Sequence, residues 1–188
     1  METLLRAFDI VRGPVLARLI WPAVARLTPL TRAEIEVTSR ALGPDAIEYS
    51  AVRIGEGRLL KLFFRLNGGR AFTTFRIVNL PRHGCHARTN TSLLVHELVH
   101  VYQFERVGSQ YIAQALRAQR TEGYRYDGWI GLNDARQSCR RYRDYNREQQ
   151  AQIAQDYYRH VLEPDLPADD PIAQAYEPYI AELRGGDL

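Results

Sequence analysis

The sequence predicts an α+β fold, mostly helical, in a single domain that spans residues 1–188. Apolar residues recur at helical spacing over residues 1–42, and the same pattern returns over residues 90–183. Between them, residues 45–80 are rich in β-branched and aromatic side chains, with glycine-containing turns. We therefore expect N-terminal helices, then a small antiparallel sheet, then a larger helical part.

The N-terminal part is expected to form two helices, over residues 3–12 and 15–29, and then a shorter one. Apolar side chains of the first two are expected to cover core surface: Leu4, Phe8, Val15 and Leu19. Because arginines are interleaved among them, the alternative is a helix that lies on a membrane surface. The shorter helix follows Thr31, which is expected to form a capping box with Glu34, and it ends near Ala41.

The middle part contains three strand-like stretches, over residues 46–54, 59–65 and 70–78. Gly55-Glu56-Gly57 and Asn67-Gly68-Gly69 separate them, and both segments are typical of hairpin turns. Two successive hairpins predict an antiparallel sheet. In the C-terminal part, capping residues and apolar spacing predict helices over residues 91–106, 109–119 and 144–162 and from Asp170-Pro171 onward, with a loop over 121–134.

Composition limits the classes of function. Hydrophobic residues make up 45% of the 188 residues, and the formal net charge is only +3. A charge this small, with arginines spread along the chain, predicts no nucleic-acid partner. No apolar run approaches the ~18 residues of a membrane span, and no cleaved signal is recognisable, so we expect a cytoplasmic protein. Two cysteines, Cys85 and Cys139, are expected to stay reduced there.

The segment with the strongest chemical signal is His96-Glu97-Leu98-Val99-His100. Two histidines four residues apart project from one face of a helix, and their imidazoles can bind one zinc ion. Glu97 lies on an adjoining face, where it can reach a zinc-bound water as general base without ligating the metal. Apolar neighbours predict a buried helix, and burying such polar groups is costly unless something binds them. The sequence therefore predicts a zinc site.

A catalytic zinc has three protein ligands as a rule, and no third histidine follows at short range. The main candidates are two carboxylates, Glu148 and Glu122. Glu148 is favoured because it lies in a predicted helix, a rigid element, and Ala151 allows that helix to approach closely. Glu122 lies in a loop beside Gly123 and is the alternative.

The pattern Glu148-x-x-Ala151 after such a helix resembles the gluzincin metallopeptidases, whose third ligand is that glutamate. Residues 27–158 are similar, more narrowly, to short bacterial gluzincin-like proteins catalogued as metallopeptidases or as Vgr-related proteins of contractile injection systems. The matching segments are Leu30-Thr31-x-x-Glu34, Tyr49-x-x-Val52-Arg53-Ile54, Ala71-Phe72-Thr73 and Leu94 to Gln103. The resemblance implies a zincin-like domain with Glu148 as ligand. It also implies a supporting Asp at the position where this chain has Gln152.

The resulting prediction is a zinc-dependent metallopeptidase that acts on a peptide or protein substrate. Zinc would activate water, Glu97 would transfer the proton, and a further donor would stabilise the oxyanion. Tyr126 is the predicted donor, with Tyr124, Arg125 and His160 as alternatives. By the resemblance, the strand over residues 72–77 would pair with the substrate. Residues 83–86, His-Gly-Cys-His, are expected to form a loop without a second metal.

The alternative is a non-catalytic zinc-binding structural or cargo protein of a phage-tail-like or type VI (Vgr-related) secretion apparatus. Such a protein would be exported without a cleaved signal and would contact other proteins of the apparatus. A zinc ion closed by a fourth protein ligand would favour this alternative, whereas an open zinc ion in a cleft would favour the enzyme.

Overall fold

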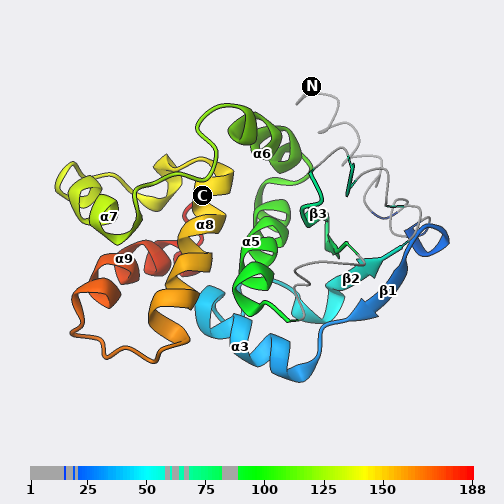
Figure 1. Ribbon diagram of the computed structural model, residues 1–188, viewed down its shortest axis with the longest axis horizontal. Helices are drawn as coiled ribbons and strands as arrows, with labels where there is room; N and C mark the ends of the chain where they lie inside the picture. Colours follow the sequence, from blue (N-terminus) through cyan, green and yellow to red (C-terminus); the bar gives the residue numbers. More distant parts are fainter. Residues whose placement is uncertain are drawn as a thin grey trace.

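The fold is described from a computed structural model, which covers Val15, Leu19 and residues 21–57, 60, 64–65, 68–81 and 89–188 (Figure 1). Its α-helices are α3 (Arg32–Leu42), α5 (Thr91–Val107), α6 (Gln110–Arg120), α7 (Gly128–Gln137), α8 (Arg147–Tyr157) and α9 (Pro171–Gly185). Its strands are β1 (Arg26–Pro29), β2 (Arg53–Glu56), β3 (Phe72–Thr74) and β4 (Ile77–Asn79). Short 3-10 turns are η1 (Trp21–Ala23), η2 (Tyr49–Ala51) and η3 (Tyr142–Asp144), and a π-turn, η4 (Tyr158–Leu162), extends α8.

Helix α5 is the centre of the molecule. The sheet lies on one side of it and α8 on the other, with α9 and α7 beyond α8 and α3 beneath (Figure 1). The middle of α5 is fully buried, and the Tyr102 hydroxyl donates to the Leu183 carbonyl of α9, at 2.7 Å. This arrangement confirms the α+β prediction and places the predicted metal-binding helix between two layers.

The sheet is mixed, and the prediction of a wholly antiparallel sheet is wrong. The strand order is β1-β2-β4-β3, and β2 and β4 are parallel neighbours, while the outer pairs are antiparallel. Burial explains this order. All three residues of β4 are buried, as an interior strand requires, whereas β3 alternates around a buried Thr73. Strand β3 therefore occupies the edge, where it contacts α5.

Several predicted elements differ from the observed ones. Residues 46–54 form η2 and only the start of β2, and the end of the predicted 15–29 helix is η1 and β1. Most of the predicted 59–65 strand lies outside the described residues, although Phe64 and Arg65 are helical. Val15 and Leu19 are 56% and 73% exposed, so these two side chains do not cover the core, while Leu4 and Phe8 lie outside the described residues.

The predicted loop over residues 121–134 contains the start of α7. Gly128 and Gly131 lower its helix propensity, but Gly131 has a packing reason: a Cβ there would lie 2.5 Å from the Tyr126 carbonyl oxygen. Leu132 is buried beneath α9, whose Tyr179 hydroxyl donates to its carbonyl. Tertiary contacts therefore stabilise a helix that the local sequence disfavours.

The helix starts agree best with the sequence. Thr31 and Glu34 form the expected capping box, and Asp170 caps α9 ahead of Pro171. Helix α5 is capped by Asn90, through a 3.1 Å bond from the Leu93 amide to the Asn90 side-chain oxygen, whereas the sequence favoured Thr91 or Ser92 as the capping residue. Such signals are local, so they can be recognised without knowledge of the tertiary structure.

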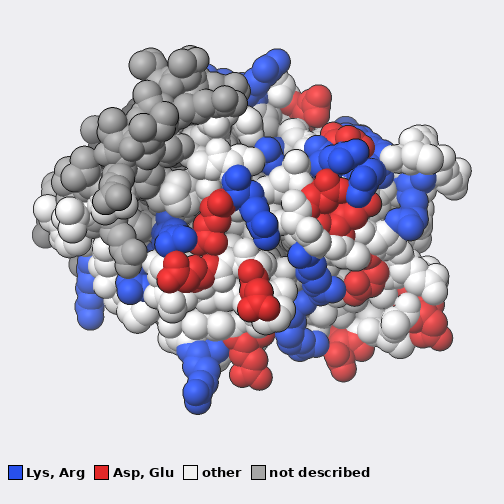
Figure 2. All heavy atoms as spheres, turned by 180° about the vertical axis from the view of Figure 1, so that it is seen from behind, with Lys and Arg blue, Asp and Glu red and all other residues white. Residues whose placement is uncertain are grey.

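The surface carries mixed charge. On the face seen in Figure 2, arginines and carboxylates alternate, and salt bridges such as Arg76–Glu48 and Arg40–Asp165 join opposite signs across the described surface. Among the described residues, no helix is long and apolar enough to cross a membrane.

Candidate metal centre

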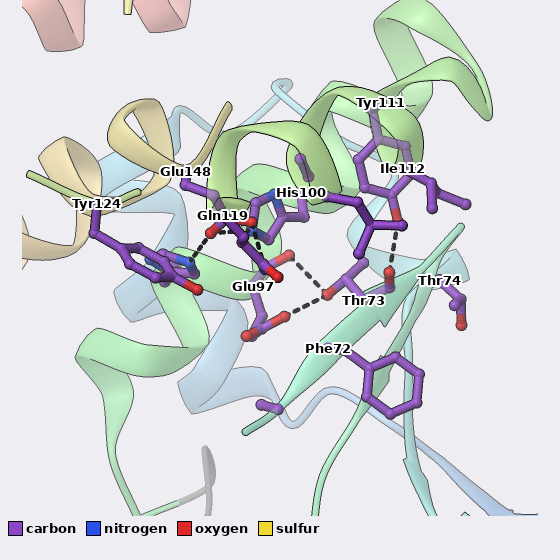
Figure 3. Close-up of a pocket in the computed structure, with 14 residues that line it drawn as sticks. Phe72, Thr73, Thr74, Glu97, His100, Tyr111, Ile112, Gln119, Tyr124 and Glu148 are labelled. Carbon is purple, nitrogen blue, oxygen red and sulfur yellow. Dashed lines mark hydrogen bonds and ion pairs between the residues drawn. The ribbon is translucent and has the colours of Figure 1, made fainter. Parts of the chain in front are cut away.

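Two helices bring three ligand side chains together. His96 and His100 lie one turn apart on α5, and Glu148 lies in the first turn of α8, which packs against the same face (Figure 3). Glu148 Oε2 is 3.5 Å from His96 Nε2 and 3.6 Å from His100 Nε2. We call these three residues the ligand cluster. Each is buried, and one ligand atom from each lies within 4.8 Å of the others.

The spacing within the ligand cluster fits a tetrahedral zinc ion. Zinc lies ~2.0–2.1 Å from nitrogen and oxygen ligands, and two tetrahedral ligands at that distance are ~3.4 Å apart. The two Nε2–Oε2 separations are close to this value. In addition, Glu148 Oε2 and His96 Nδ1 are buried without a hydrogen bond. A carboxylate oxygen without a hydrogen bond, deep in a protein, indicates a site built for a ligand.

The remaining carboxylate oxygen of Glu148 is held by α6. The Gln119 side-chain amide donates to Oε1 at 2.8 Å (Figure 3). The Asn146 cap holds the Glu148 backbone, because its side-chain oxygen accepts from the Glu148 amide at 3.0 Å. Glu148 is therefore fixed at both ends, and Oε2 is directed at the two imidazoles. Such support from outside the ligand set orients a metal ligand before the metal binds.

A chain of amides fixes the orientation of His100. Gln103 donates from Nε2 to the Arg147 carbonyl and to Gln150 Oε1, both at 3.0 Å. Its own Oε1 therefore faces His100 Nδ1, at 2.8 Å, and can only accept a hydrogen bond, so Nδ1 must carry the proton and donate it to this bond. A proton on Nδ1 leaves the lone pair of Nε2 free to bind a metal ion. The Tyr142 hydroxyl donates to the Gln150 carbonyl, which completes what we call the amide cluster: Gln103, Gln150 and Tyr142.

Without metal, the ligand cluster forms an ion pair. Burial lowers the pKa of His100, but contact with Glu148 outweighs it and raises this pKa to about 9. Burial likewise opposes ionisation of Glu148, yet its close contacts with the imidazoles of His100 and His96 hold its pKa far below its usual range. In the metal-free protein, the positive charge of protonated His100 therefore balances the negative charge of the Glu148 carboxylate.

The carboxylate of Glu97 faces the same space and is held by the sheet. The buried Thr73 hydroxyl of β3 donates to Glu97 Oε2 at 2.8 Å and lies 3.2 Å from the Glu97 carbonyl (Figure 3). The Tyr111 hydroxyl of α6 donates to the Thr73 carbonyl at 2.6 Å. Strand β3 therefore links α5 to α6, and Glu97 is positioned beside the ligand cluster without belonging to it.

A cavity of about 320 Å³ opens on these residues. Its walls are β3, α5, α6 and Tyr124, and its lining includes all three ligands together with Glu97. A second hollow lies on the other side of His96 and Glu97, next to Arg70, Gln152 and Gln155. The two hollows share Tyr124, which lies beside the cluster in Figure 3. The predicted base and ligands are thus accessible from solvent through a cleft.

The other predicted site residues lie elsewhere. Tyr126 is buried in the core, where its hydroxyl donates to Asp156 and pairs with Tyr176, both at 2.8 Å, so the prediction of Tyr126 as oxyanion donor is not supported by its position. Glu122 is exposed and receives a 3.4 Å contact from Asn146. Arg125 pairs with Asp127 at the surface, and His160 is exposed on η4.

Sequence reasoning missed the residues that orient the site. It assigned support of a histidine to Gln152, whose amide instead donates to Asp156 at 2.9 Å. Gln103 could have been recognised from spacing, since His96, His100 and Gln103 follow the i, i+4, i+7 pattern of one buried face. Gln119 and Thr73 carried no such signal, because their role depends on how α6 and β3 pack.

The segment His83-Gly84-Cys85-His86, expected to be a loop, lies outside the described residues, whereas Cys139 is exposed with a free thiol.

Comparison of the chain with protein-family models, with curated proteins and with solved structures finds no match. The function proposed below therefore depends on the site geometry and on the chemistry of its residues.

Proposed function

We propose that this protein is a zinc-dependent peptide hydrolase. The observation that carries the proposal is the convergence of His96, His100, Glu148 and Glu97 on one cleft. Two histidines and one carboxylate are a ligand set of catalytic zinc, which keeps a further position for water. Among the described His, Cys, Asp and Glu residues, only these three ligands cluster.

When bound, zinc would lower the pKa of a coordinated water toward ~7 and polarise the substrate carbonyl. Glu97 would accept the proton of that water and later give it to the leaving amine. Because Thr73 occupies Glu97 Oε2, Oε1 is the oxygen that we assign to this transfer. The hydrogen bond also fixes the carboxylate plane, so the base would need little reorganisation.

Tyr124 is the residue of the cleft that we assign as oxyanion donor, in place of Tyr126. Its ring lies 5.7 Å from that of His96. Burial, and next the negative charge of Glu148, raise the pKa of Tyr124 to about 12, so its hydroxyl keeps its proton at neutral pH. A protonated phenol in a cleft can donate to the negative charge that develops on the carbonyl oxygen.

The test is Glu97→Gln in zinc-loaded protein, with Glu122→Gln as the matched control. We expect Glu97→Gln to retain zinc and the melting temperature and to lose ~100-fold or more of the hydrolysis of a mixed peptide library. Glu122→Gln should match wild type, because Glu122 is exposed outside the cleft. Hydrolysis that survives Glu97→Gln would contradict the mechanism.

The alternative of a non-catalytic cargo or structural protein predicts a closed metal site. Residues 83–86 hold the side chains that could supply a fourth ligand. The absorption spectrum of the cobalt-substituted protein, compared with a His83→Ala, Cys85→Ser, His86→Ala variant, decides the matter. An unchanged spectrum supports the open site, whereas loss of a thiolate band or of metal affinity favours the closed one. Association with a secretion apparatus is a proposal from the resemblance, and co-purification with such an apparatus would test it.

A further inference from the structure

Strand β3 lies at the edge of the sheet and forms a wall of the cleft, where an extended peptide could add to the sheet. In an antiparallel pair, a residue directs its backbone N–H and carbonyl either both toward the partner strand or both away from it. Thr73 lies opposite Val78 of β4, but its carbonyl accepts from α6, so it faces away from β4. Phe72 and Thr74 must then face β4, which leaves Thr73 as the residue of β3 with which a peptide strand could pair.

The Tyr111 hydroxyl of α6 already occupies this position. It donates to the Thr73 carbonyl at 2.6 Å, where the backbone N–H of an added strand would donate (Figure 3). Tyr111 is only 2% exposed, and burial raises the pKa of its hydroxyl, so the hydroxyl keeps its proton and remains a donor. Proteins often cover an edge strand with a helix, which prevents pairing with another chain. In this protein, the covered edge lies inside the cleft.

Helix α6 cannot move away from β3 without disturbing the ligand cluster. Its Gln119 amide holds Glu148 Oε1 at 2.8 Å, and the Tyr111 ring stacks on that of His100, with the centroids 6.2 Å apart. Both contacts involve proposed metal ligands, so a protein that retains the metal also retains α6 over the edge. A peptide that enters the cleft therefore meets a strand whose outward carbonyl is already used.

We propose that the substrate chain is short on the side of α6, so that the site removes a chain end or cleaves a short peptide. The proposal rests on the proposed function, because the ligand cluster defines where the scissile bond lies. The cavity of about 320 Å³ between β3 and α6 accommodates about one or two residues. Beyond them, β3 offers no outward carbonyl to the N–H groups of a longer substrate. Tyr111 sets this limit, in contrast to the strand pairing over residues 72–77 that the resemblance implied.

Calorimetry of the zinc-loaded protein with alanine-peptide hydroxamates tests this limit, because hydroxamates chelate zinc whether or not the protein hydrolyses peptides. The compounds carry one to four residues on either side of the chelating group, and each longer one has a partner with an N-methylated backbone amide beyond the first residue. The series that runs along α6 is recognised by weaker binding to Leu116→Asp, since Leu116 lines the cavity but not the second hollow. In that series, we expect affinity to change by less than about threefold between the second and fourth residues and on N-methylation.

Two tyrosine variants assign the limit to the Tyr111 hydroxyl. Tyr111→Phe releases the Thr73 carbonyl, so the N–H compounds of that series should bind more tightly than their N-methyl partners, by more than about threefold. Tyr179→Phe is the matched control, because it removes a buried hydroxyl that also donates to a backbone carbonyl, that of Leu132, outside the cavity lining. It should behave as wild type.

A larger gain from the third or fourth residue in the wild-type protein, or a larger loss on N-methylation, would overturn the proposal. So would two series that are both insensitive to Leu116→Asp. If the paired compounds bind Tyr111→Phe equally, the hydroxyl is not what closes the edge, and Tyr111 does not set the limit. Failure of acetohydroxamate, the compound without a peptide, to bind would instead refute the open zinc site of the proposed function.

Discussion

Two polar clusters lie one after the other along the interface of α5 and α8, and they differ in one respect. In the amide cluster, the donors and acceptors of Gln103 and Gln150 are paired with one another, with His100 or with backbone groups. In the ligand cluster, Glu148 Oε2 and His96 Nδ1 have no hydrogen bond. Both clusters are buried. The fold can therefore satisfy polar groups at this interface, and where it does not, a ligand is expected.

The largest expected effect is on the ligand cluster itself. Glu148→Ala removes one of three ligands and a negative charge beside a dication, and loss of a supporting residue alone costs ~10–100-fold in metal affinity. We expect zinc affinity to fall by ~100-fold or more in a competition titration with a chelator. Glu122→Ala should leave it unchanged, because Glu122 is exposed and is not among the described residues that line the cavity. If Glu122→Ala loses zinc while Glu148→Ala retains it, Glu148 is not a metal ligand.

A second prediction concerns pH and the metal-free protein. The pKa of His100 is raised in the fold from 6.5 to about 9, so its stabilising contribution is complete below pH 6.5 and is lost as pH rises through 9. The pKa of Glu148 is lowered from 4.5, so its contribution is complete above pH 4.5 and is lost on acidification. Both contributions are complete between pH 4.5 and 6.5.

Metal-free protein should therefore lose stability from pH 6.5 to 9, on the order of 2–3 kcal/mol for the pair counted once. Zinc-loaded protein should show the reverse trend, since the metal requires deprotonated imidazoles. Urea unfolding at several pH values, with and without a chelator, measures both. A metal-free protein whose stability is flat across this range would show that His100 and Glu148 are not paired.

The amide cluster should influence the metal through His100. Gln103→Ala removes the acceptor for Nδ1–H, so the ring loses its fixed tautomer, and zinc affinity should fall by ~10–100-fold. It also leaves Gln150 Oε1 with one partner fewer, so a loss of ~1–3 kcal/mol in unfolding free energy is expected. Gln103→Glu keeps an acceptor and should recover part of the zinc affinity. If the loss of zinc affinity in these variants is no larger than their loss of unfolding free energy explains, Gln103 has only a structural role.

The smallest effect is expected at Gln152. Its amide donates to Asp156, and it supports neither histidine. Gln152→Ala should change zinc affinity by no more than about twofold, within the ±0.5 kcal/mol typical of surface substitutions. A tenfold loss would show that this residue turns toward His96 once the metal is bound, as the resemblance to gluzincins implies.

The contrast between the clusters also shows what could be predicted from the sequence. His96, Glu97 and His100 come from one helix, so their spacing is enough to place them together. Glu148 was identified through its position on a second helix, and its proximity to the histidines agrees with that prediction. Gln119 and Thr73 were missed because their partners lie on other elements, 29 and 24 residues away, whereas Gln103 lies on the same helix as His100 and its spacing was overlooked.

The features of the fold also separate into those that depend on local sequence, which could be predicted, and those that depend on tertiary contacts, which could not. Helix starts at Thr31 and Asp170 depend on hydrogen bonds within a few residues, and the sequence predicted both. The parallel pairing of β2 with β4 and the strand β1 depend on which segments meet in the sheet, and hydrophobic spacing carries no information about that. Helix α7 was missed because Gly131 reads locally as a helix breaker, although it is needed for close packing on Tyr126.

The separation of the ligands along the chain has a consequence for folding. His100 and Glu148 are 48 residues apart, and the chain between them forms α6 and α7. A metal held by both is a cross-link that closes this long loop, so it restricts the unfolded ensemble as a disulfide would. Chelation should then loosen α6 and α7 before the rest of the domain, and hydrogen exchange of their amides would report the state of the metal.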